Sequence, residues 1–180
     1  MKFKDSEKLI QKFLRDTRLF WQIIFLISIL AYGLTFIHHL NTRAIPPYIS
    51  HFRTIDLASF ALALILALSI FRFKRKYFRI RFMRTFMEEY HHSHPEADES
   101  LVIKRLLRFM TSKLKIVWVM GAALILLGVI FYWYSYTTKN LHVYFIVGLY
   151  SLIMNYPRKE LFGDLPYFVW EIVKGLEEEE

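Results

Sequence analysis

The feature that most constrains this chain is the segregation of its apolar residues into four nearly uninterrupted blocks, at residues 19–37, 57–71, 116–136 and 141–156. A helix rises about 1.5 Å per residue, so roughly 20 residues cross the hydrocarbon core of a bilayer. The first and third blocks reach that length. The second and fourth need flanking aromatic or long basic side chains to complete a crossing. Because no block carries a polar face, the pattern predicts four membrane spans rather than a soluble bundle.

A secretory signal peptide is the alternative for the first block. The block follows 18 charged, amphipathic residues, lacks an Ala-x-Ala cleavage motif and precedes the bulky His38-His39-Leu40. We therefore expect a retained first span. The chain contains no cysteine, which excludes disulfides, a thiol nucleophile and thiolate metal sites.

The distribution of Lys and Arg predicts the orientation. Of the 24 basic residues, 21 lie before the first block, between the second and third, or after the fourth; the others are Arg43, Arg53 and Lys139. Because basic residues concentrate on the cytoplasmic side of a membrane, both termini and the long middle connection are expected in the cytoplasm. The expected location is the cell (plasma) membrane.

The predicted fold is all-α: an integral membrane four-helix bundle with a cytoplasmic helical hairpin that extends spans two and three. The expected segments are an amphipathic cytoplasmic helix at 1–18, a first transmembrane hairpin at 19–72, a basic cytoplasmic hairpin at 73–115, a second transmembrane hairpin at 116–156, and an interfacial helix with an acidic tail at 157–180. No Gly or Pro lies between Asp56 and Pro95, so the helix of span two is expected to continue unbroken to that proline.

Two apolar stripes are expected to hold the cytoplasmic hairpin together. The first has four-residue spacing and comprises Phe78, Phe82, Phe86 and Tyr90, with Met83 and Met87 beside them. The second comprises Ile103, Leu106, Leu107, Met110 and Leu114. Both follow the period of a helix, so the stripes are expected to pack against each other or against a neighbouring subunit.

In the stretch at residues 71–84, basic residues alternate with aromatic residues. Five cations are expected at the level of the lipid phosphates, where each contributes about 1 kcal/mol of attraction to anionic headgroups: Arg72, Lys74, Arg75, Lys76 and Arg79. Intersubunit ion pairing and an anion-attracting vestibule are the alternatives. Nucleic acid is not an expected partner, because a stripe beside a bilayer is poorly placed to enter a groove.

Histidines suggest a metal site at the outer ends of the spans. His38 or His39 closes span one and His142 opens span four, so these imidazoles lie at one depth and form the predicted metal-ligand set. A second group, His91, His92 and His94, is more typical of a solvated hairpin tip. No histidine lies inside a span to bind haem, and no cofactor is expected.

The remaining signals favour helix packing over chemistry. No ionisable residue lies deep in any block, which disfavours an ion-coupled transporter, and the chain lacks the common catalytic motifs, so it is not expected to be an enzyme. Small residues predict close helix packing, inside one chain or between copies: Ser59, Ala63, Ala67, Gly121 and Gly128.

Two functions fit these patterns. The first is a homo-oligomeric channel or passive pore with a basic cytoplasmic vestibule, and Gln22, Ser28, Tyr32 and Thr35 offer a modest polar track along span one. The second is a non-catalytic membrane subunit or scaffold that docks a partner through its cytoplasmic hairpin and tail. The channel ranks slightly ahead because it requires no further protein.

Overall fold

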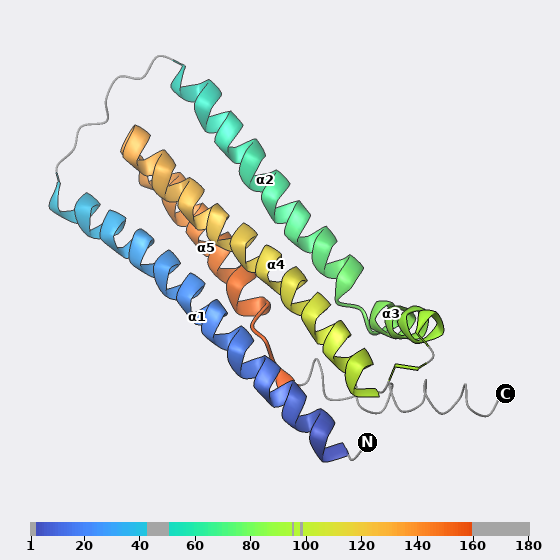
Figure 1. The fold of residues 1–180 in the computed structure, drawn as a ribbon. Coiled ribbons are helices and arrows are strands. Elements are labelled where there is room, and N and C mark those ends of the chain that lie inside the picture. The colour runs from blue at the N-terminus through green and yellow to red at the C-terminus, as the bar shows by residue number, and fades with distance from the viewer. Residues whose placement is uncertain (1–2, 43–50, 95, 98, 160–180) are drawn as a thin grey trace. The chain divides into compact units, whose positions relative to one another are not determined.

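The computed structural model describes residues 3–42, 51–94, 96–97 and 99–159. These residues form five helices and no strand: α1 (Phe3–Asn41), α2 (Phe52–Tyr77), α3 (Ile80–Ser93), α4 (Glu99–Ser135) and α5 (Thr138–Met154) (Figure 1). The prediction of an all-α chain is therefore confirmed.

Three helices, α1, α2 and α4, are long and apolar enough to cross a membrane. With 17 residues, α5 is shorter than the roughly 20 that a full crossing takes. The fourth span therefore stays a prediction. The interfacial helix and acidic tail predicted at 157–180 lie, from residue 160 onward, outside the described residues.

The chain divides into two compact units. We call Trp21–Phe73 with Lys115–Tyr156 the apolar unit, and Met1–Phe20 with Lys74–Leu114 and Pro157–Glu180 the basic unit. In the apolar unit, α4 and α5 run side by side, with α1 and α2 flanking the pair (Figure 1). Only Tyr136 and Thr137 separate α4 from α5, and such a short connection makes the two helices antiparallel neighbours.

Glycines set the distance between α4 and α5. A Cβ atom added to Gly148 would lie 2.6 Å from Cγ1 of Ile125 and 2.7 Å from the carbonyl oxygen of Gly121. One added to Gly128 would lie 3.2 Å from Cβ of Tyr144. At Gly148 the two backbones thus approach more closely than a larger residue allows, whereas at Gly128 a larger residue would need its neighbours to shift slightly. Close approach of this kind is the usual role of small residues between packed helices.

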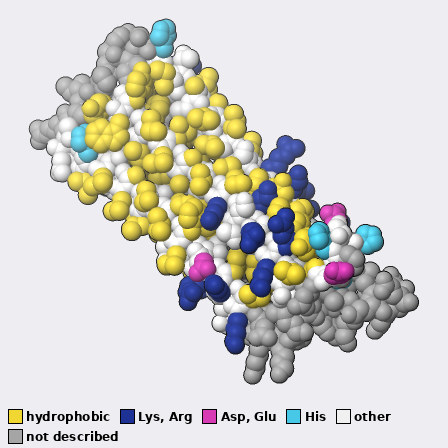
Figure 2. Space-filling model, in the orientation of Figure 1, with side chains coloured by type: hydrophobic (Ala, Val, Ile, Leu, Met, Phe, Trp, Pro, Cys, Tyr) yellow, Lys and Arg dark blue, Asp and Glu magenta, His cyan; other side chains and the backbone are white. Residues whose placement is uncertain are grey.

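The exposed faces of α1 and α2 in the apolar unit are dominated by large aliphatic side chains. Figure 2 shows hydrophobic side chains covering the visible face of this unit. Those on α1 include Ile23, Leu26, Ile27, Leu30, Leu34 and Ile37, and those on α2 include Leu57, Leu64, Ile65 and Leu68. Continuous apolar surface of this extent is typical of lipid contact.

Side-chain donors satisfy the carbonyl groups at the C-terminal end of α5. The indole nitrogen of Trp118 donates to the carbonyl of Asn155 at 2.8 Å, and that of Trp21 donates to the carbonyl of Leu152 at 2.9 Å. The side-chain amide of Asn155 donates to the carbonyl of Ser151 at 2.7 Å. The last four carbonyls of a helix have no partner within the helix, so these donors let α5 end among apolar side chains.

The basic unit is held together by apolar contacts between α3 and α4. Phe109 of α4 stacks on Phe82 and Phe86 of α3, with ring centroids 5.9 and 4.8 Å apart. All members of the predicted second stripe are buried: Ile103, Leu106, Leu107, Met110 and Leu114. The helix α4 continues without a break from Glu99 to Ser135, whereas the cytoplasmic hairpin itself stays a prediction.

The predicted extension of span two is wrong at residues 78–79. Tyr77 ends α2, Arg79 is extended with φ −89° and ψ 140°, and α3 is a separate helix. Like charges four residues apart, as at Arg75 and Arg79, weaken a helix at this point. The break lets α3 bury Met83 and Met87, whose packing offsets the hydrogen bonds that a continuous helix would keep.

Candidate functional site

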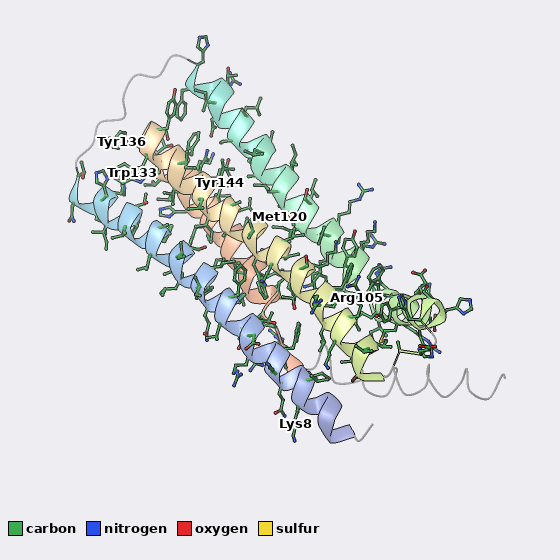
Figure 3. All side chains as sticks on the ribbon, viewed as in Figure 1. Lys8, Arg105, Met120, Trp133, Tyr136 and Tyr144 are labelled. Atoms are coloured by element: carbon green, nitrogen blue, oxygen red, sulfur yellow. The ribbon has the colours of Figure 1, made fainter. Side chains whose placement is uncertain are left out.

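The exposed face of α1 changes from basic to apolar along the helix. Lys8, Lys12 and Arg15 are exposed, and the spacing of four and three residues places them on one face with Leu19 and Ile23, which are also exposed. Figure 3 shows Lys8 projecting from α1. This helix therefore carries its own boundary between a charged and an apolar surface.

The same change occurs on α2, in the opposite chain direction. Its exposed face is apolar through Leu68 and Phe71 and becomes basic at Arg72. Of the predicted headgroup-contact residues, four are exposed and Lys74 is half-buried; the four are Arg72, Arg75, Lys76 and Arg79.

On α4 the boundary falls between Lys115 and Ile116, both of which are exposed. The cations before it, Lys104, Arg105 and Arg108, are exposed on the side of α4 opposite its buried stripe (Figure 3, Arg105). Among the described residues of this unit, Arg84 pairs with Glu88 at 3.0 Å, an exposed ion pair within α3 that adds little to stability. The described part of the basic unit therefore presents a cationic surface.

Four hydrogen bonds between side chains link the helices of the apolar unit. The Tyr32 hydroxyl lies 2.9 Å from Nδ1 of His142, and Nδ1 of His38 lies 3.1 Å from the Tyr132 hydroxyl. The hydroxyls of Ser59 and Tyr144 are 3.0 Å apart, and Asn140 donates to the Asp56 carboxylate. These polar groups are thus paired within the chain.

Of the predicted metal ligands, His38 and His39 both contact Tyr132, whereas His142 has different partners. His38 packs on Trp133, with ring centroids 4.4 Å apart, whereas His142 lies against Tyr32 and Phe36 of α1. His39 contacts the ring of Tyr132 at 5.9 Å. No three His, Cys, Asp or Glu side chains converge in the described part of the chain. The metal site stays a prediction, which zinc titration of His38→Ala and His142→Ala variants tests.

The predicted polar track of span one is bonded inside the chain. The Ser28 hydroxyl donates to the carbonyl of Ile24 at 2.8 Å and the Thr35 hydroxyl to that of Ala31 at 2.7 Å. Both side chains are buried, whereas Gln22 is exposed. These two hydroxyl groups therefore have hydrogen-bond acceptors on their own helix and are not exposed.

The small residues of α2 face the other helices of the apolar unit. Ser59 is bonded to Tyr144 of α5, Ala63 is buried and Ala67 is half-buried. Gly121 and Gly128 lie on the contact of α4 with α5. Ser59, Gly121 and Gly128 thus have neighbours within one chain, and the role of the five residues in helix packing stays a prediction.

Two features were missed by reasoning from the sequence. The indole donors that cap α5 have no sequence signal, because the donor Trp118 and the acceptor Asn155 are 37 residues apart. The second is a groove on α1 lined by Lys8, Gln11, Lys12 and Arg15. The sequence signal for this groove is the spacing of these four residues, which places them on one face of a helix.

Comparison with known protein families, with curated proteins and with solved structures gives no match to this chain. Its function therefore has to be argued from its own surfaces. Two stand out in the described residues. One is the apolar exterior of the spanning helices, and the other is the cationic exterior of the basic unit.

Proposed function

We propose that this protein is a non-catalytic membrane subunit that docks an acidic partner protein on the exposed basic face of α4. The observation that carries the proposal is the position of Lys104, Arg105 and Arg108. Ile116 is the first exposed apolar residue of α4 after these cations. It follows Arg108 by eight residues and Lys104 by twelve, or about 12–18 Å of helical rise. The headgroup layer is only about 5–8 Å thick on each side. Lipid phosphates therefore do not account for these cations.

The basic face of α4 is also held in place. The opposite side of the same helical segment is buried through Ile103, Leu106, Leu107 and Met110. A rigid support lowers the entropy that the protein loses when it binds a partner. Exposed cations on such a support favour fast association with an acidic surface and add selectivity for it.

The proposed topology places all four apolar blocks across the membrane, with both termini and the basic unit in the cytoplasm. The imbalance of basic residues supports the orientation. The satisfied carbonyls at the end of α5 support its place as the fourth span, because backbone groups inside a bilayer need partners within the protein.

Binding of a model acidic ligand tests the docking function. The full chain in phosphatidylcholine nanodiscs is titrated with a fluorescein-labelled decaglutamate peptide. A triple variant in which Lys104, Arg105 and Arg108 become Gln should bind about tenfold more weakly, since three exposed ion pairs of about 0.5 kcal/mol each are lost.

The matched control replaces the three exposed cations of α1, Lys8, Lys12 and Arg15, with Gln. It removes the same charge from another helix and should weaken peptide binding less than threefold. Equal weakening by both variants would mean that net charge alone attracts the peptide, and the docking face on α4 would be refuted.

A pore between copies of the chain is the second candidate. It is favoured by the outward face of α1, where Gln22 is exposed among aliphatic residues and a Cβ added to Gly33 would meet nothing within 4 Å. Polar and small residues on such a face promote helix association in lipid. Because the chain has no cysteine, Gln22→Cys is a clean probe for a disulfide across that interface.

A pore predicts two results together. Oxidation should cross-link the Gln22→Cys protein in liposomes. The preference of the flux for chloride over cations should disappear when Arg72, Arg75 and Arg79 become Glu. Monomeric protein without flux would remove the channel from consideration and leave the docking function unaffected.

A further inference from the structure

We propose that the cationic groove on α1 is a binding site for a ligand that carries more than one phosphate group. The groove has a volume of about 420 Å³ and is lined by Lys8, Gln11, Lys12 and Arg15. All four side chains are exposed. The site lies on a different helix from the docking face on α4 and does not depend on it.

The lining has the chemistry that phosphate requires. Phosphate oxygens accept hydrogen bonds from ammonium and guanidinium groups, and a guanidinium binds two of them at once. From Lys8 to Arg15 the groove extends over seven residues, or about 10 Å, which is too long for a single phosphate. The amide of Gln11 adds an uncharged donor suited to an ester oxygen or a hydroxyl group between phosphates.

The ion pair that the structure describes at this groove is a weak one. Nε of Arg15 lies 3.7 Å from a carboxylate oxygen of Asp16, and both side chains are mostly exposed, at 74% and 59%. Such a pair is weak in water and leaves Arg15 available to a ligand with higher charge.

The direction in which the groove faces is fixed by packing on the other side of α1. Ile10, Leu14 and Thr17 are buried there. One turn further, Nε of Arg18 donates to the carbonyl of Pro157 at 3.2 Å. The four lining side chains are therefore held on one exposed face.

The position of the groove favours an anion at a membrane surface. Leu19, the first exposed apolar residue of this face, follows Arg15 by four residues, or about 6 Å. The site thus starts where a lipid phosphate would lie and extends away from it. This arrangement fits a headgroup with additional phosphates beyond the diester. A free anion with several phosphates has the same chemistry and is the other source of the ligand.

The experiment measures binding to the purified full-length chain by calorimetry. The lipid probe is a dioctanoyl phosphatidylinositol bisphosphate, with dioctanoyl phosphatidylcholine as the neutral reference, and the soluble probe is pyrophosphate. The test variant changes Lys8, Lys12 and Arg15 to Gln. The matched control makes the same charge change at the three exposed cations of α4, Lys104, Arg105 and Arg108.

We expect the α1 variant to bind the bisphosphate lipid at least tenfold more weakly, since each cation near a headgroup contributes separately. The α4 control should change the affinity less than threefold. If pyrophosphate binds and is lost with the same α1 variant, the soluble anion is a ligand as well; if only the lipid binds, the headgroup is the ligand.

Two outcomes overturn the proposal. Equal weakening by the α1 and α4 variants would show that diffuse positive charge, not the groove, attracts phosphate. Absence of binding by the unmodified chain to both phosphate probes would show that no site exists. Because every altered side chain is exposed, the variants keep the packing of α1 and α4, which circular dichroism verifies.

Discussion

Changing Trp118 to Phe tests how α5 ends inside an apolar environment. Trp118 is fully buried, and its indole N–H is the donor to the carbonyl of Asn155 at 2.8 Å. A phenyl ring keeps most of the apolar contact but has no donor. The carbonyl is then buried without a partner, which costs about 1–3 kcal/mol, and the smaller ring adds about 1 kcal/mol for the space it leaves. We expect a loss of about 2–4 kcal/mol in the free energy of unfolding.

The assay is reversible unfolding of the full chain by SDS in mixed micelles, followed by circular dichroism. Trp133→Phe is the matched control, because it makes the same chemical change on the same helix at an exposed position. It should cost less than about 1 kcal/mol. If the two variants unfold at the same SDS concentration, the Asn155 carbonyl has another partner, and the indole of Trp118 is not what lets α5 end among apolar side chains.

Three further predictions follow from the packing and the topology. Gly148→Ala should destabilise the chain by about 1–3 kcal/mol, because its Cβ would overlap the backbone of α4, whereas Gly33→Ala should be neutral or slightly stabilising in the same SDS titration. Phe109→Ala should cost about 2 kcal/mol and speed proteolysis within α3, since the ring stacks on two aromatic residues of that helix. In right-side-out membrane vesicles, an impermeant maleimide should label Lys139→Cys but not Arg105→Cys, and the reverse pattern would refute the orientation.

The helical fold of this chain could be predicted from its sequence because the signals are local. The stripe from Ile103 to Leu114 repeats with the period of a helix, and no breaker interrupts it, so the sequence predicts the long α4 correctly. The three long apolar segments are equally plain, because length and hydropathy are properties of a contiguous stretch.

The break between α2 and α3 could not be predicted in the same way. Phe78 and Arg79 are neither Gly nor Pro, and the apolar period continues through them. The burial of Met83 and Met87 in α3 is a tertiary contribution to stability, which the local sequence does not show. Propensity is a weak guide wherever packing of this kind offsets the loss of a few backbone hydrogen bonds.

The candidate sites show the same division between local and tertiary information. Histidine positions predicted a shared depth for His38 and His142, but the partners of each, Tyr132 and Tyr32, depend on how α1 is rotated against α4 and α5. That rotation is set by which residues of α1 are buried, such as Ser28 and Thr35. This rotation cannot be predicted from the sequence of any single helix.

The exposed basic residues of α1, α2 and α4 fall into two groups, which differ in their distance from the point where the helix surface changes from cationic to apolar. On α1, α2 and α4 the exposed face changes from cationic to apolar within a few residues, at Arg15 to Leu19, at Phe71 to Arg72 and at Lys115 to Ile116. A change of this kind on three helices is what a membrane boundary would produce, and it supports the proposed topology. In the proposed topology, cations within one turn of the change would lie at the level of the lipid phosphates.

Cations two or more turns from the change are different, because a headgroup layer of about 5–8 Å does not reach them. Lys104 and Arg108 on α4, and Lys8 on α1, belong to this second group. In the proposed topology, ligands of these cations would extend from the membrane or come from solution, as an acidic protein or a multiply phosphorylated group does. Increasing the fraction of anionic lipid should therefore stabilise the chain through the first group of cations, with little effect on affinity for ligands of the second.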